Sequence, residues 1–417
     1  ALGAGGRAMA NHWIAHIDLA VAVAVGLLHC WEVVCHHHDL NTLSVREQKM
    51  VALKMENGFY YSFYEEVVAA PSTQLALQSV LRDRRSEAPT TINALHRFNI
   101  YQELLCGLLY RALRWLLGGA VPLDAWYFYR GCSYALQGVG HAALVLLASF
   151  FGGGGLRGGA LPGVALACWL FLHRGDIGRI HDVGQLVLRE NWAMPVLLCQ
   201  VLALHRLAGA HPALGGAGGA GYLWWLWSFR ITTTACLVLW QFSAFAFMLQ
   251  VAAVFLCTLL SCDARARRVC WAILASHLGS LAAAAVLLFG NELLVHHLFV
   301  SQCLAIAAVL LWRRNPPSSW ALFWVDGALA VVVFAALRVV HSPWATADEH
   351  VAEIFRAKLH ELAPRYFSAT VAEQMTFNAR LYKAVSVFDF IDMQTVRTAI
   401  PTCAYHFAGA GAVLWLV

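Results

Sequence analysis

The sequence predicts an all-α polytopic membrane protein. Of its 417 residues, 60% are hydrophobic and only 13% are charged, whereas soluble globular domains carry roughly 25% charged residues. Apolar runs of about 18 to 22 residues recur along the chain, each long enough to cross the hydrocarbon core of a membrane as a helix. The runs are continuous rather than alternating, which excludes an outer-membrane barrel. A soluble enzyme is therefore excluded, and a small, dispersed net charge of +5 gives no reason to expect nucleic acid as a partner.

The apolar runs predict ten membrane spans. They cover residues 13–34, 126–150, 156–173, 191–208, 222–240, 241–261, 270–290, 292–312, 320–340 and 399–417. No small-residue cleavage site follows the first run, so we expect this helix to be retained. A further apolar stretch, 103–119, is interrupted by Arg111 and Arg114 and is expected to lie on the membrane surface.

These spans divide the chain into five parts. They are an N-terminal segment with the first transmembrane helix (1–35), a first luminal loop with amphipathic helices (36–125), a transmembrane bundle that includes a luminal loop at 174–190 (126–340), a luminal helical segment (341–398) and a last transmembrane helix (399–417).

Arginines in the short loops predict the orientation, because Lys and Arg in such loops prefer the cytoplasm. One side collects Arg157, Arg206, the Arg265, Arg267 and Arg268 cluster, and Arg313 with Arg314. The loops 36–125, 174–190 and 341–398 then share the opposite, luminal side.

The luminal loop 174–190 breaks this rule, since it carries Arg174, Arg179 and Arg189. An anionic ligand at that face would explain them. The alternative is a structural network in which acidic residues of the same loop, Asp176, Asp182 and Glu190, neutralise the arginines.

One carboxylate lies in an aromatic helix face. In the segment KMENGFYYSFYEEVVAAPS, Glu56, Phe59, Tyr60 and Phe63 recur at the spacing of one helix face. A carboxylate among aromatic rings is expected to be desolvated and able to act as a base. The alternative is that Glu56 caps an interfacial helix, and periodicity alone does not choose between the two.

Several strings resemble one family. They are PTTINALHRFNIYQELLCGLLYR (89–111), LRENWAMP (188–195), the Glu56 segment, RGDIGR, LWQFSAFAFMLQVAAVF (239–255), HLGSLAAAAVLLFGNELL (277–294) and FNARLYKAVSVFDFID (377–392). Together, and in this order over nearly the whole chain, they resemble the Dumpy-type protein (tryptophan) C-mannosyltransferases of the endoplasmic reticulum membrane, which belong to the GT-C superfamily.

The resemblance implies a transferase that moves mannose from dolichyl-phosphate mannose to C2 of a tryptophan indole in secretory or membrane proteins with Trp-x-x-Trp motifs. The family's catalytic carboxylate matches Glu56, which would stabilise the cationic indole and remove its C2 proton. Phe59, Tyr60 and Tyr61 are expected to hold the indole by stacking.

The dolichyl phosphate that leaves needs cationic partners, and guanidinium groups are well suited to phosphate. Arg179 and Arg189 are the first candidates, with Arg174 and Arg97 behind them. On this account no metal ion and no cofactor is needed, the lipid tail lies between spans, and the active site faces the lumen.

Two other classes stay open. One is a degenerate, inactive GT-C fold that serves as a structural subunit of a larger membrane complex, because the family's C-terminal luminal domain is expected to lie beyond Val417. The joint presence of Glu56, Arg179 and Arg189 favours the enzyme, since charged groups are costly near lipid. The other class is a transporter, which would need repeated halves, and the sequence has no internal repeat.

Overall fold

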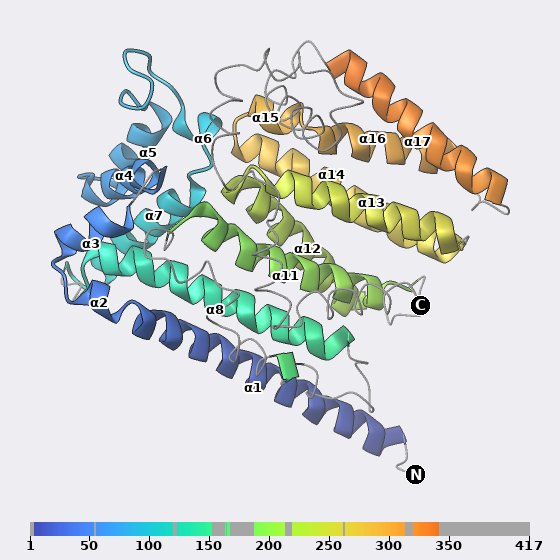
Figure 1. Cartoon of the computed structure of the whole chain (residues 1–417), viewed down its shortest axis with the longest axis horizontal. Coiled ribbons are helices and arrows are strands. Elements are labelled where there is room, and N and C mark those ends of the chain that lie inside the picture. Colours follow the sequence, from blue (N-terminus) through green and yellow to red (C-terminus); the bar gives the residue numbers. More distant parts are fainter. Residues whose placement is uncertain are drawn as a thin grey trace, which may run out of the picture. The chain divides into compact units, whose positions relative to one another are not determined.

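The protein is described here from a computed structural model. The structure describes residues 4–53, 56–119, 123–151, 163, 165–166, 187–212, 219–261, 263–312 and 320–341. Within these ranges the regular elements are helices, and one isolated β-bridge joins Asp83 to Ile92 (Figure 1). The predicted all-α class is therefore confirmed for the described residues.

The helices fall into long bundle helices and shorter ones at one end of the bundle. The long helices are α1 (Ala4–His36), α8 (Ala125–Phe151), α11 (Arg189–Ala210), α12 (Gly219–Leu239), α13 (Ser243–Ser261), α14 (Ala264–Leu287), α16 (Leu298–Trp312) and α17 (Trp320–His341). The others are α2 (His38–Asn41), α3 (Val45–Ala52), α4 (Glu56–Ala69), α5 (Thr73–Leu81), α6 (Ala94–Arg97), α7 (Tyr101–Leu116) and α15 (Glu292–Val295).

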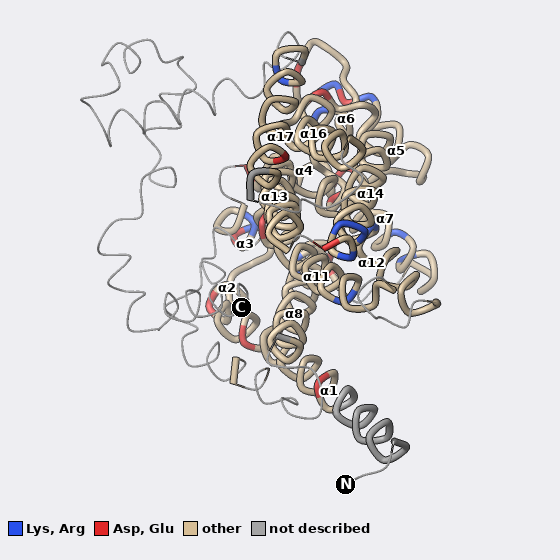
Figure 2. The backbone as a smooth tube through the Cα atoms, turned by 90° about the vertical axis from the view of Figure 1, so that its right-hand side faces the viewer, with Lys and Arg blue, Asp and Glu red and all other residues tan. Residues whose placement is uncertain are grey.

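In the described part of the chain, seven segments are long and apolar enough to cross a membrane. They are Ile17–His36, Ala125–Phe150, Arg189–Ala210, Ser243–Ser261, Ala264–Leu287, Glu292–Trp312 and Leu322–Val340. The protein is thus a polytopic membrane protein. Most of the described tube carries no charged residue, and the charged positions form short stretches along it (Figure 2).

The seven segments correspond to seven of the ten predicted spans. The predicted span 222–240 is a helix, α12, but it is not among the seven. Its tryptophans and Arg230 lower its mean hydropathy. The run 103–119 forms α7 and is also not among the seven, in line with a helix that does not cross. The span 399–417 and nearly all of 156–173 lie outside the described residues.

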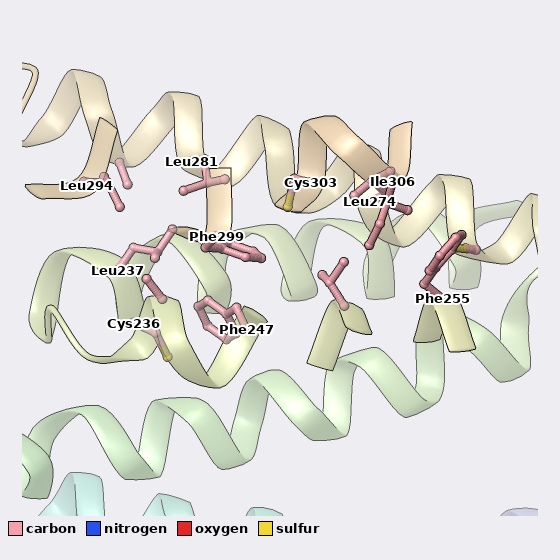
Figure 3. Packing of buried hydrophobic residues seen from close by; sticks show 14 of the residues in the cluster. Cys236, Leu237, Phe247, Phe255, Leu274, Leu281, Leu294, Phe299, Cys303 and Ile306 are labelled. Atoms are coloured by element: carbon pink, nitrogen blue, oxygen red, sulfur yellow. The ribbon is translucent and has the colours of Figure 1, made fainter. Parts of the chain in front are cut away.

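The long helices pack side by side, and the contacting pairs include both antiparallel and parallel neighbours. Contacts join α1 to α8, α8 to α11, α11 to α12 and α12 to α14, and α13, α14 and α16 contact one another. A core of buried apolar side chains, among them Phe247, Leu274 and Phe299, fills the space between the helices from α11 to α17 (Figure 3).

Helices α2 to α7 lie at the end of the bundle where α1 finishes and where α8 and α11 begin (Figure 1). We call this the loop end. Helices α12 and α14 also finish there, since Asn99 bonds the end of α12 and Tyr101 bonds the end of α14. Arg338 of α17 bonds the carbonyl oxygen of His296. The described parts of 36–125 and 174–190, both predicted to be luminal, therefore share one end of the bundle.

Helices α1 and α8 touch backbone to backbone at two glycines. A Cβ atom placed on Gly138 would lie 2.5 Å from Sγ of Cys30 and 2.7 Å from the carbonyl oxygen of Gly26. The Cys30 thiol also donates a hydrogen bond of 3.3 Å to the carbonyl oxygen of Tyr134. Small residues permit this close approach, as is common between transmembrane helices.

Gly138→Ala is therefore expected to destabilise the bundle by about 1 to 3 kcal/mol, because the added methyl group meets backbone atoms that have little room to move. The matched control is Gly131→Ala on the same helix, where an added Cβ meets no atom within 4 Å. Thermal unfolding in detergent should show a lower Tm for Gly138→Ala only. Equal Tm values would contradict the close contact.

Candidate functional site

Helix α4 carries the predicted catalytic segment and is held on three sides. Tyr60, Phe63 and Val67 pack with residues of α5, α6 and α7, whereas Tyr61 and Tyr64 pack with residues of α8 and α11. The residues of this helix that stay exposed are Glu56, Glu65 and Ala69.

The close contact between α4 and α7 depends on Gly107, since a Cβ atom there would lie 2.5 Å from Cγ1 of Val67. The end of α4 is fixed by Arg111 of α7. Its guanidinium donates hydrogen bonds to the carbonyl oxygens of Val67 at 3.2 Å, Val68 at 3.4 Å and Ala70. A cation at this position also interacts favourably with the helix dipole. Helix α4 is thus held firmly on α7.

Glu56 is the first residue of α4 and its side chain is exposed. The expectation that the aromatic residues desolvate this carboxylate is therefore wrong. The helical spacing was right, but Glu56 stands in the first turn of α4 and is exposed to solvent. An anion at a helix N-terminus is also favoured by the helix dipole.

Arg189 brings a positive charge to this carboxylate. It is the first residue of α11, is 9% exposed, and its guanidinium carbon lies 3.6 Å from the ring centre of Tyr60. The carboxylates of Glu56 and Glu190 both attract this guanidinium. The Nε atom of Arg189 is buried and has no hydrogen-bond partner among the described residues. Arg189 thus lies over Tyr60, and Glu56 lies one helical turn before Tyr60 on α4.

The three predicted aromatic residues take different positions. Phe59 is half-buried, with its ring centre 4.9 Å from that of Phe98, and Tyr60 lies under Arg189. Tyr61 is only 2% exposed, because its ring packs between those of Trp126 and Tyr129 at 5.4 and 5.3 Å. Successive residues of a helix point about 100° apart, so Tyr61 faces the protein interior and offers no surface for an indole.

Of the other predicted arginines, the structure describes Arg97 alone. Arg97 ends α6, and its Nε atom pairs with Oε1 of Glu87 at 2.8 Å, with 57% of its side chain exposed. Arg174 and Arg179 lie outside the described residues, as do Asp176 and Asp182 of the alternative structural network. In the described ranges, no three His, Cys, Asp or Glu side chains are grouped so that they could hold a metal ion.

A second acidic residue lies in the protein interior near the site. Glu103 of α7 is 1% exposed, and its Oε1 accepts a hydrogen bond of 2.8 Å from the Tyr129 hydroxyl. Burial raises the pKa of the Glu103 carboxyl to about 8, although the bond from Tyr129 opposes this shift. The sequence pattern that indicates a buried Glu103 is an acid on the face of α7 opposite Leu105 and Leu109, which are exposed.

The raised pKa predicts a pH effect on stability. The folded protein keeps the Glu103 proton up to about pH 8, whereas the unfolded chain loses it near its ordinary pKa. The loss of folding stability caused by this buried carboxyl therefore grows as the pH rises between the two pKa values. It is complete above about pH 8, where it reaches on the order of several kcal/mol. Glu103→Gln removes this cost, so its Tm should exceed that of wild type more at pH 8.5 than at pH 5. An equal difference at both pH values would contradict the shift.

Hydrogen bonds of residues 96–101 connect the first loop to the bundle. The Asn99 amide donates hydrogen bonds of 3.2 and 3.0 Å to the carbonyl oxygens of Leu237 and Val238 at the end of α12. The Tyr101 hydroxyl bonds the carbonyl oxygen of Leu287, and the Asn291 amide bonds that of His96. The helices that carry the site are thereby fixed to the membrane helices.

These features define a class of protein, a polytopic α-helical membrane protein with a carboxylate, aromatic rings and an arginine gathered at one end of its bundle. Residues 22–414 match the family model described as Dpy19: Q-cell neuroblast polarisation. The chain belongs to the Dpy19 family, which confirms the resemblance found in the sequence.

Relatives with similar sequences are named as C-mannosyltransferases. The chain is 27% identical to the C-mannosyltransferase dpy-19 of Caenorhabditis briggsae, over 97% of its own length and 59% of that protein. It is 25% identical to the human protein C-mannosyl-transferase DPY19L1, over 90% of its own length and 56% of that protein. The chain thus spans somewhat more than half the length of these curated relatives.

Proposed function

We propose that this protein is a C-mannosyltransferase that moves mannose from dolichyl-phosphate mannose to C2 of a tryptophan indole in secretory or membrane proteins. The observation that carries the proposal is the contact of Arg189 of α11 with Tyr60 of α4, one helical turn from Glu56, at one end of a membrane bundle. The names of the relatives support the same reaction.

In this reaction the indole C2 carbon forms a bond to the anomeric carbon of mannose, while the bond from that carbon to the phosphate oxygen breaks. The electron pair leaves with dolichyl phosphate. The indole ring is then cationic and must lose its C2 proton. Glu56 accepts this proton as the general base, and its negative charge stabilises the cation that precedes the transfer. The exposed position of Glu56 lets a protein substrate reach it.

The remaining residues bind the two substrates. Arg189 has a buried Nε atom without a partner among the described residues, and this N–H group suits a phosphate oxygen of the donor. The half-buried Phe59, beside Tyr60, is proposed as the stacking surface for the indole. Arg179 and Arg174 are proposed as further phosphate ligands. Arg97 can join them only if it leaves Glu87.

We further propose that the loop end faces the lumen of the endoplasmic reticulum. The arginines of the short loops on the opposite side support this orientation. Dolichyl-linked donors place their tail between the spans and their sugar at the membrane surface, beside this end of the bundle. The acceptors would be proteins that enter the lumen with Trp-x-x-Trp motifs, and no metal ion is assigned a step.

The direct test uses the purified protein in lipid with dolichyl-phosphate mannose and a peptide that contains Trp-x-x-Trp. Mass spectrometry should find one added hexose, and fragmentation should place it on a tryptophan. A peptide with phenylalanine in place of both tryptophans is the control. Folded protein that forms no product would overturn the proposal and would favour the alternative of an inactive subunit.

A further inference from the structure

The buried Glu103 has no role in the reaction as proposed. It lies on α7 and bonds Tyr129 of α8 at 2.8 Å, and no described residue forms a hydrogen bond to its second carboxyl oxygen. A buried acid without a cationic partner costs stability. A cost of this kind at a position close to the site calls for a function.

Tyr129 connects Glu103 to the start of α11. The Tyr129 ring centre lies 5.2 Å from the ring of Trp192 and 4.7 Å from that of Tyr64. Trp192 is buried and follows Arg189 by one helical turn, so the two side chains lie on the same side of α11. The position of the Tyr129 ring therefore determines where Trp192 can pack, and with it the direction of the first turn of α11.

We propose that Glu103 is a positioning residue of the transferase site. By fixing the Tyr129 hydroxyl, it sets the Tyr129 ring against Trp192 and so holds Arg189 over Tyr60 and beside Glu56. This inference rests on the proposed function, because it takes Arg189 to bind the donor phosphate. Glu103 itself touches neither substrate.

Three features support a positioning role rather than packing alone. The Tyr129 ring also contacts Tyr61 and Tyr64 of α4, the helix that begins with Glu56, so one hydroxyl is fixed where both site helices meet. A polar bond is used where apolar side chains would pack at lower cost. A hydrogen bond also depends on direction, so the bond from the Tyr129 hydroxyl to Glu103 can fix the orientation of the Tyr129 ring.

The test compares Glu103→Leu, Tyr129→Phe and the double variant, each reconstituted in lipid and normalised to folded protein. Each single change should raise the KM for dolichyl-phosphate mannose about tenfold, the effect of one lost hydrogen bond, and leave the KM for the peptide unchanged. The donor KM of the double variant should not exceed the larger of the two single-variant values, because both changes remove the same hydrogen bond. Glu103→Gln keeps an acceptor oxygen for Tyr129 and should restore donor binding.

A matched control is Tyr110→Phe on the same helix, because the Tyr110 hydroxyl donates a 3.0 Å bond to the carbonyl oxygen of Leu123 and makes no link to α11. It should lower stability without raising the donor KM. Unchanged donor KM values in Glu103→Leu and Tyr129→Phe, or additive effects in the double variant, would overturn the inference while wild type remains active. An inactive wild type would instead refute the proposed function.

Discussion

Glu56→Gln is expected to lower the rate of mannose transfer about a thousandfold and to leave the protein folded. A positioned general base contributes roughly 10² to 10⁴ in rate, and an amide cannot accept the indole proton. The side chain is exposed and begins its helix, so the stability cost is limited to about 0.3 to 1 kcal/mol from the helix dipole. Single-turnover transfer to the peptide gives the rate, and thermal unfolding gives the stability.

The control for this variant lies on the same helix. Glu65 is also exposed and pairs with Lys49 at 2.7 Å, so Glu65→Gln removes one carboxylate from α4 at a place away from Arg189. It should keep nearly the wild-type rate. If Glu56→Gln kept full activity as well, the base would have to be a different group.

Arg189→Ala should lower kcat/KM for the donor about a hundredfold, the effect expected when a preorganised donor to a developing anion is lost. Arg189→Lys should recover only part of this loss, because an ammonium group cannot offer two parallel N–H bonds. Titration with dolichyl-phosphate mannose at saturating peptide measures the effect. The peptide KM should change little, since Arg189 is assigned to the phosphate.

A second arginine separates a specific effect from a change in net charge. Arg114 of α7 is exposed and is not assigned to the site, so Arg114→Ala should leave donor kinetics unaffected. Arg97→Ala should have a smaller effect than Arg189→Ala, because Arg97 is already paired with Glu87. A similar loss in all three variants would mean that the arginines act only through the overall charge.

The helices could be predicted well from sequence, because length and apolarity decide whether a segment spans a membrane. The same reasoning predicts from two arginines in an apolar stretch that α7 does not cross, and α7 is not among the described segments long and apolar enough to span. Helix α12 lies at the border of this method, since tryptophan side chains are amphipathic and Arg230 is charged.

The site could be predicted only where one helix contains the pattern. Glu56 and Tyr60 are one turn apart, so their common face follows from helical spacing. The bond from Tyr129 to Glu103 and the contact of Tyr129 with Trp192 join residues on separate helices, and no local period encodes such pairs. The orientation of Tyr61 was missed for the same reason, since it depends on Trp126 of another helix.

The contact between α1 and α8 also has a consequence for the time course of synthesis. Cys30 and Tyr134, which bond across this contact, are separated by 104 residues. At about 5 to 20 residues per second, the ribosome needs roughly 5 to 20 seconds to make the intervening chain. During this interval the Gly26 face of α1 lies in the bilayer without α8, and a delay in translation between the two helices would prolong the exposure of that face.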